Sequence, residues 1–145
     1  MFKPEGILPA LVTPFTDDGK AVDEERMRFL VNSCLEAGVH GVVPCGTTGE
    51  FVNLSIEEKK RVIKTVVDEV NGRVPVVAGT GASGTEQAVE MTKYAKDVGA
   101  DAALIVTPFY LKPADRGIYE HYYTIASEVD LPIILYNIPQ CTGLP

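Results

Sequence analysis

The chain has 145 residues, which is enough for one domain with a buried core. Hydrophobic residues make up 46% of it, but no apolar stretch approaches the roughly 20 residues that span a bilayer, so no membrane partner is expected. A net charge of −7 disfavours binding to nucleic acid, which attracts basic surfaces. Three cysteines without metal-ligand spacing indicate free thiols, so we expect a cytoplasmic protein with no metal site.

Five short apolar runs along the chain predict strands. They are rich in Val, Ile, Leu and Ala and do not alternate with polar residues. This composition is typical of strands that are buried on both faces of a parallel sheet. The runs cover residues 6–12, 41–44, 74–78, 102–106 and 132–135.

Helical periodicity fills the intervals between these runs. The first helix is expected to start near Asp23, and the second opens with Ser55 and Glu58 at the spacing of a capping box. On the last helix, Ile125 and Ala126 are expected to face inward. The four helices are predicted at about 23–37, 55–70, 85–98 and 115–127.

Strands and helices therefore alternate at nearly regular intervals from the first strand to the fifth. This order is typical of α/β proteins and fits either a doubly wound sheet or part of a (β/α)8 barrel. No linker, charge run or low-complexity segment interrupts it. We expect residues 1–145 to belong to one domain.

The segment Gly46-Thr47-Thr48-Gly49-Glu50 directly follows the second predicted strand. Backbone N–H groups and two hydroxyls next to glycines allow a small carboxylate or phosphate to approach the backbone closely. Glycines at a strand-to-helix turn also occur for purely steric reasons. The loop alone leaves both interpretations open.

A second glycine-rich segment, from Gly79 to Gly84, matches the G-x-G-x-x-G pattern of dinucleotide-binding proteins. It follows the third predicted strand rather than the first, and the next strand ends in Val106-Thr107-Pro108, without an acidic residue for a ribose hydroxyl. We therefore favour a tight turn between strand and helix, and no cofactor.

Polar and aromatic residues recur where the predicted strands end, which is the rim where α/β proteins bind ligands. Taken separately, Tyr136 could be a core aromatic residue, and Tyr110 could serve packing or an interface. The motifs at these ends are, in chain order, Thr13-Pro14-Phe15, Gly46-Thr47-Thr48-Gly49-Glu50, Ala78-Gly79-Thr80-Gly81, Val106-Thr107-Pro108-Phe109-Tyr110 and Tyr136-Asn137-Ile138-Pro139.

This ordered set, which extends over nearly the whole chain, resembles the dihydrodipicolinate synthase / N-acetylneuraminate lyase family. The resemblance implies a (β/α)8 TIM barrel, of which this chain supplies about the first five strands and four helices. It also implies a class I aldolase, a lyase that joins pyruvate to a lysine as a Schiff base and uses an aldehyde as second substrate. Enzymes of this family are commonly homotetramers and need no metal or organic cofactor.

The resemblance also implies roles for individual residues. Thr47 and Thr48 would bind the pyruvate carboxylate, with Gly46 and Gly49 in the same loop. Tyr136 would shuttle protons beside the imine. In the synthase branch, Thr47 would link Tyr136 to a tyrosine from a neighbouring subunit.

That second tyrosine would be Tyr110. A relay of hydroxyls is chemically reasonable, because forming and collapsing a carbinolamine requires several proton transfers.

Two departures from the family pattern qualify these expectations. The synthase branch has an arginine where this chain has Cys141, and a thiol cannot clamp a carboxylate as a guanidinium does. A 2-keto-3-deoxy sugar-acid aldolase of the same family is therefore the alternative. The Schiff-base lysine of the family lies on the sixth strand, beyond Pro145, and the lysines present fall on the N-terminus, loops and helices.

We therefore expect this chain alone to be inactive. It would be an N-terminal piece of a complete barrel, one chain of a split enzyme, or a self-associating half-barrel. In the last case it could be a non-catalytic module that binds 2-oxo acids.

Overall fold

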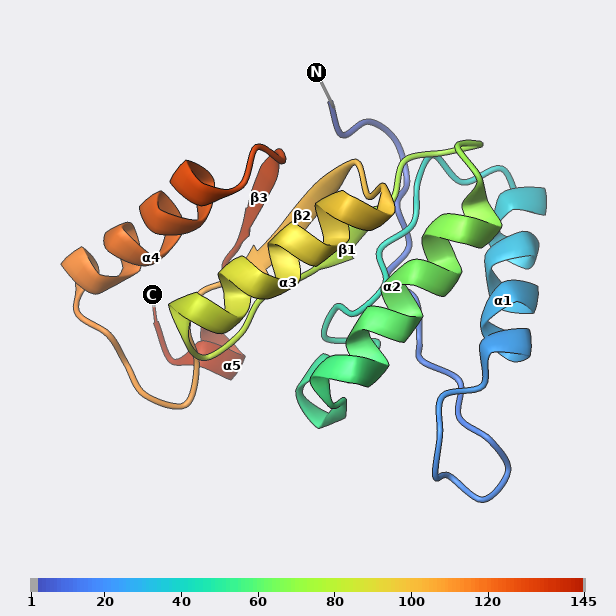
Figure 1. Cartoon of the computed structure of the whole chain (residues 1–145), viewed down its shortest axis with the longest axis horizontal. Coiled ribbons are helices and arrows are strands. Elements are labelled where there is room, and N and C mark those ends of the chain that lie inside the picture. The colour runs from blue at the N-terminus through green and yellow to red at the C-terminus, as the bar shows by residue number, and fades with distance from the viewer. Residues whose placement is uncertain (1–2, 145) are drawn as a thin grey trace.

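The computed structural model describes residues 3–144 and has the alternating order that the sequence predicts. A parallel sheet contains β1 (Val77–Gly79), β2 (Ala102–Val106) and β3 (Ile133–Tyr136), paired in that order. Figure 1 shows these three strands next to one another, with the long helices arranged along them. The last three predicted strands are thus confirmed, with shifts of up to three residues at their ends.

The first two predicted strands are extended segments that are joined by single bridges instead of regular ladders. Ala10 pairs with Val43, and Val42 pairs with Val76, both in parallel. These bridges continue the sheet in chain order on the far side of β1. Prolines in and beside the segments lack the N–H that a ladder needs, which shortens the pairing. They are Pro9, Pro44 and Pro75.

The four predicted helices form where expected, and the start signals of the first two are satisfied. The Asp23 side chain accepts a hydrogen bond from the Arg26 N–H, and Ser55 and Glu58 form the reciprocal capping box. The helices are α1 (Glu24–Glu36), α2 (Ile56–Val70), α3 (Thr85–Val98) and α4 (Asp115–Glu128). Two short elements were not predicted, η1 (Phe51–Asn53) and α5 (Pro139–Thr142).

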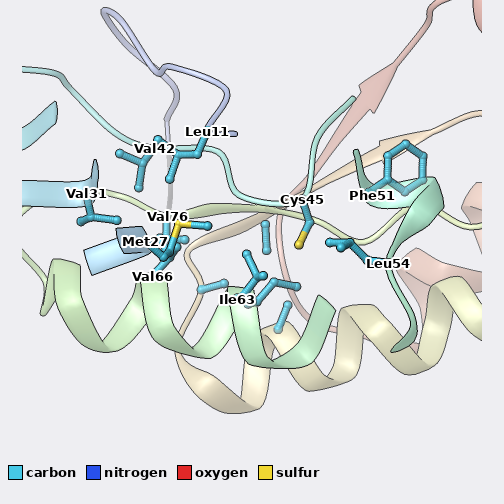
Figure 2. Packing of buried hydrophobic residues seen from close by; sticks show 14 of the residues in the cluster. Leu11, Met27, Val31, Val42, Cys45, Phe51, Leu54, Ile63, Val66 and Val76 are labelled. Atoms are coloured by element: carbon cyan, nitrogen blue, oxygen red, sulfur yellow. The ribbon is translucent and has the colours of Figure 1, made fainter. Parts of the chain in front are cut away.

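The long helices pack side by side in chain order over one face of the sheet (Figure 1). Alternate residues of the strand segments face opposite sides, so Val42 and Val76 pack with Met27 of α1 in the main core (Figure 2). Val43 and Val77 belong to a smaller cluster on the other side. Burial on both faces explains the continuous apolar runs of the sequence.

One side of the molecule lacks a covering element within the described residues. β3 pairs only with β2, and Leu135 on this edge strand is 64% exposed. Ala126 is exposed, so the prediction that it faces inward was wrong, because nothing in residues 3–144 covers that side of α4. Ile7, on the segment at the opposite edge of the sheet, is 68% exposed.

Candidate functional site

The Gly46–Glu50 loop lies at the carboxyl end of the second extended segment and is held by its own hydrogen bonds. The Gly49 N–H donates to the Gly46 carbonyl at 3.1 Å, and the Glu50 N–H donates to the Thr47 carbonyl at 3.0 Å. The Thr13 hydroxyl donates to the Gly49 carbonyl at 2.7 Å. Two of these bonds lie within the loop, and the third holds the loop to the neighbouring extended segment.

Both ends of this loop have backbone conformations that are rare for residues with side chains. Cys45 has a φ of 57° and Glu50 has a φ of 55°, in the left-handed region. Each such residue costs on the order of 1 kcal/mol, and strain of this kind concentrates at functional sites. This strain makes the loop a candidate functional site.

The loop presents free hydrogen-bond donors. Among the described residues, no protein group accepts from the backbone N–H of Thr47 or of Thr48, and both residues are exposed. A Cβ added to Gly46 would meet no atom within 4 Å, so its small size leaves open space rather than relieving a clash. This arrangement can bind a small anion.

The structure brings Thr47 and Tyr136 together across 89 positions of sequence. Their side-chain oxygens lie 3.4 Å apart, although β1 and β2 separate their segments in the sheet. Both residues line a small cavity of about 10 Å³, together with Gly46 and Phe51. A space of this size is close to that of one water molecule.

A larger pocket of about 330 Å³ lies next to Thr47. Its walls include Phe51, Phe109 and Ile138. Cys141, which belongs to the short helix α5, also lines it. None of the residues described around this pocket carries a charge; the others are Val52, Val106 and Thr142. A carboxylate entering it would find no cationic partner among them.

Tyr110 lies apart from the other predicted site residues. Its side chain is 94% exposed, and its φ of 73° is unusual for an aromatic residue. Within residues 3–144, its side chain makes no hydrogen bond or ring contact with Thr47 or Tyr136, so this chain alone does not assemble the predicted three-residue relay.

The G-x-G-x-x-G segment has a steric explanation. A Cβ on Gly79 would lie 2.0 Å from the Cys45 carbonyl oxygen, and one on Gly81 would lie 2.7 Å from Val106. These glycines permit close packing of neighbouring backbones at the rim. This geometry supports the tight turn rather than dinucleotide binding.

Sequence reasoning missed Lys59, which is only 9% exposed although it is a lysine. Its ammonium lies 5.5 Å from the centre of the Phe51 ring. The signal was present in the helix period, because Lys59 precedes the buried Val62 and Ile63 by three and four positions.

Within residues 3–144, no group of acidic, histidine or cysteine side chains could hold a metal ion. The same part of the chain has no helix of the length and hydropathy needed to cross a bilayer.

A parallel sheet with helices along one face, and a loop with free N–H groups at the carboxyl ends of its strands, defines an α/β barrel-type protein. Comparisons with known proteins narrow this class. A model of the dihydrodipicolinate synthetase family matches residues 3–145. The chain is 58% identical to the 4-hydroxy-tetrahydrodipicolinate synthase of Methanopyrus kandleri, over 98% of this chain and 47% of that relative.

Solved structures agree with the sequence comparison. A dihydrodipicolinate synthase from Acinetobacter baumannii in complex with pyruvate superimposes with a TM-score of 0.92 at 51% identity, over 95% of this chain and 47% of that one. YagE from E. coli K12, a member of the dihydrodipicolinic acid synthase family also solved with pyruvate, gives 0.92 at 36% identity, over 95% and 46%.

The chain belongs to the dihydrodipicolinate synthetase family, which confirms the resemblance drawn from its motifs. It spans about half the length of the relatives it matches, and its fold is part of a (β/α)8 barrel.

Proposed function

We propose that this chain forms the pyruvate-binding part of a Schiff-base lyase with 4-hydroxy-tetrahydrodipicolinate synthase activity, in the cytoplasm and in lysine biosynthesis. The observation that carries the proposal is the 3.4 Å approach of the Thr47 and Tyr136 hydroxyls beside free N–H groups. An anion site and a proton-transferring hydroxyl thus lie side by side. The relatives named for this activity and the pyruvate complexes of similar structures support the same substrate.

Each residue has a defined task in this proposal. The N–H and hydroxyl groups of Thr47 and Thr48 bind the pyruvate carboxylate, and Gly46 and Gly49 let it approach the backbone. A lysine amine then forms a bond to the keto carbon, and the keto oxygen leaves as water. Tyr136 transfers protons to and from that oxygen. In this proposal the lysine lies on the sixth strand, as the family resemblance implies, so the chain alone lacks catalytic activity.

In a homotetramer, Tyr110 of one subunit acts in the site of a neighbouring subunit. The support is its position, because a tyrosine that is 94% exposed with a left-handed backbone extends away from its own chain. In the assembled enzyme its hydroxyl completes the relay through Thr47 of the next subunit.

The test uses this chain joined to the part of the Methanopyrus kandleri synthase that follows the matched region. Borohydride reduction with pyruvate should leave one covalent adduct per chimera in an intact mass spectrum. This chain alone should gain none. An adduct on the chain alone would show that it holds its own nucleophile, and no adduct on a folded chimera would contradict the proposal.

Cys141 favours a second candidate, a 2-keto-3-deoxy sugar-acid aldolase. The pocket beside Thr47 has Cys141 in its wall and no charged group among its described residues, which suits an uncharged aldehyde better than a carboxylate. Comparing glyceraldehyde with aspartate semialdehyde as acceptor for the chimera distinguishes the two candidates. Preference for glyceraldehyde, reversed by Cys141→Arg, would support the aldolase.

A further inference from the structure

Lys59 is a buried cation that has no anionic partner among residues 3–144. Five other lysines of the described chain form ion pairs at the surface, including Lys60 with Glu90 at 2.8 Å. Lys59 forms no ion pair among the described residues, although it is the one lysine there whose side chain is buried. Burial lowers the pKa of its ammonium, which reflects the cost of removing it from water.

The surroundings of Lys59 connect it to the candidate site. Its ammonium faces the ring of Phe51, which lines both the cavity and the pocket beside Thr47. The Cys45 thiol donates to the Lys59 carbonyl at 3.8 Å, and Figure 2 shows the Cys45 sulfur pointing from the loop toward α2. Cys45 immediately precedes Gly46.

The positive charge of Lys59 acts on Cys45, the residue directly before the loop. Burial raises the pKa of the Cys45 thiol to about 12, and the charge of Lys59 opposes that rise. Cys45 and Phe51 are buried whereas Thr47 and Thr48 are exposed, so water screens the field at the loop in part. A negative charge on the N–H groups of Thr47 and Thr48 would feel the same field.

We propose that Lys59 is an electrostatic positioning residue, which strengthens carboxylate binding at the Gly46–Glu50 loop from behind the wall formed by Cys45 and Phe51. The inference rests on the proposed pyruvate site and adds a residue to it. Lys59 does not touch the ligand. It acts on the charge of the ligand, which separates this role from a purely structural one.

The test measures non-covalent binding of pyruvate and of its uncharged amide, pyruvamide, to the 145-residue chain by NMR titration. Lys59→Met should weaken pyruvate binding about three- to tenfold, the range for one partly screened charge, and leave pyruvamide binding unchanged. Lys59→Arg should retain most of the affinity. Lys60→Met removes the same charge from the next position and should change neither ligand.

Equal affinities of wild type and Lys59→Met for pyruvate would overturn this role while leaving the pyruvate site intact. Equal losses for both ligands would also overturn it, because they would indicate a structural effect. If wild type binds no pyruvate, the proposed function fails and the role of Lys59 fails with it. Should Lys59→Met not fold, Lys59→Gln makes the same comparison.

Discussion

Two glycines at the rim differ in what their missing side chains allow. Gly46 faces open space, whereas a Cβ on Gly79 would collide with the Cys45 carbonyl oxygen at 2.0 Å. We expect Gly46→Ala to leave the free energy of unfolding unchanged or raised by up to about 1 kcal/mol, and to weaken pyruvate binding. Gly79→Ala should lower the free energy of unfolding by about 1 to 3 kcal/mol.

Urea denaturation of both variants measures this difference, and the NMR titration reports binding. A strong destabilisation by Gly46→Ala would show that this glycine serves the backbone rather than the ligand.

Two of the three cysteines should differ in reactivity. Cys141 is exposed, whereas the Cys45 thiol is buried and its pKa is raised to about 12. Since the thiolate is the reactive form, we expect iodoacetamide at pH 8 to modify Cys141 and to spare Cys45 until the chain unfolds. Peptide mass mapping measures both sites, with Cys141→Ser as control. Rapid labelling of Cys45 in the folded chain would contradict its burial.

At the scale of elements, the contact between α3 and α4 should be sensitive to pH. The buried His121 ring shares a hydrogen bond with the Thr85 hydroxyl through Nδ1 at 3.0 Å, and its Nε2 has no partner among the described residues. Burial lowers the His121 pKa below its usual value of about 6.5. The unfolded chain therefore binds this proton more readily than the folded chain.

It follows that the contribution of His121 is fully present above about pH 6.5 and is lost as the pH falls. We expect His121→Gln to flatten the decline in unfolding free energy between pH 7 and pH 5, measured by urea denaturation. His40→Gln, at the other histidine of the chain, which is exposed, serves as the control for the substitution itself. Parallel pH profiles for wild type and His121→Gln would contradict this account.

The elements were predictable to different degrees for physical reasons. The helices were found because caps such as Ser55 and apolar periodicity are local signals. The first two strands were less accurate, because their pairing depends on distant segments and on prolines such as Pro44. The exposure of Ala126 depends on what packs against α4, and the residue pattern of the helix does not carry that information.

At the scale of the whole molecule, the uncovered side between β3 and α4 should make the isolated chain associate. Tyr119 and Tyr123 stack on each other there, and Leu135 is exposed on the edge strand. Unpaired strand edges and exposed apolar patches favour association. We expect sedimentation velocity to show concentration-dependent association that Leu135→Glu reduces.

Phe29→Glu is the matched control, because Phe29 is 76% exposed on α1, away from that side of the molecule. Equal reductions in association by both variants would indicate an effect of net charge rather than of the surface between β3 and α4.

The candidate site was predictable where its chemistry lies in contiguous motifs. The candidate anion loop and Tyr136 were selected in this way, and the fold brings the Thr47 and Tyr136 hydroxyls within 3.4 Å. Lys59 was missed because its burial depends on packing against Phe51, which comes from an unpredicted short helix. The role of Tyr110 requires a neighbouring chain and stays a prediction.

The most direct test of the central claim is a ¹H–¹⁵N NMR titration of the wild-type chain with pyruvate. The account predicts saturable shifts centred on the amides of Thr47 and Thr48, together with a perturbed environment around Tyr136. Shifts confined to other parts of the chain, or none at millimolar pyruvate, would contradict the claim that this chain carries the carboxylate-binding part of the site.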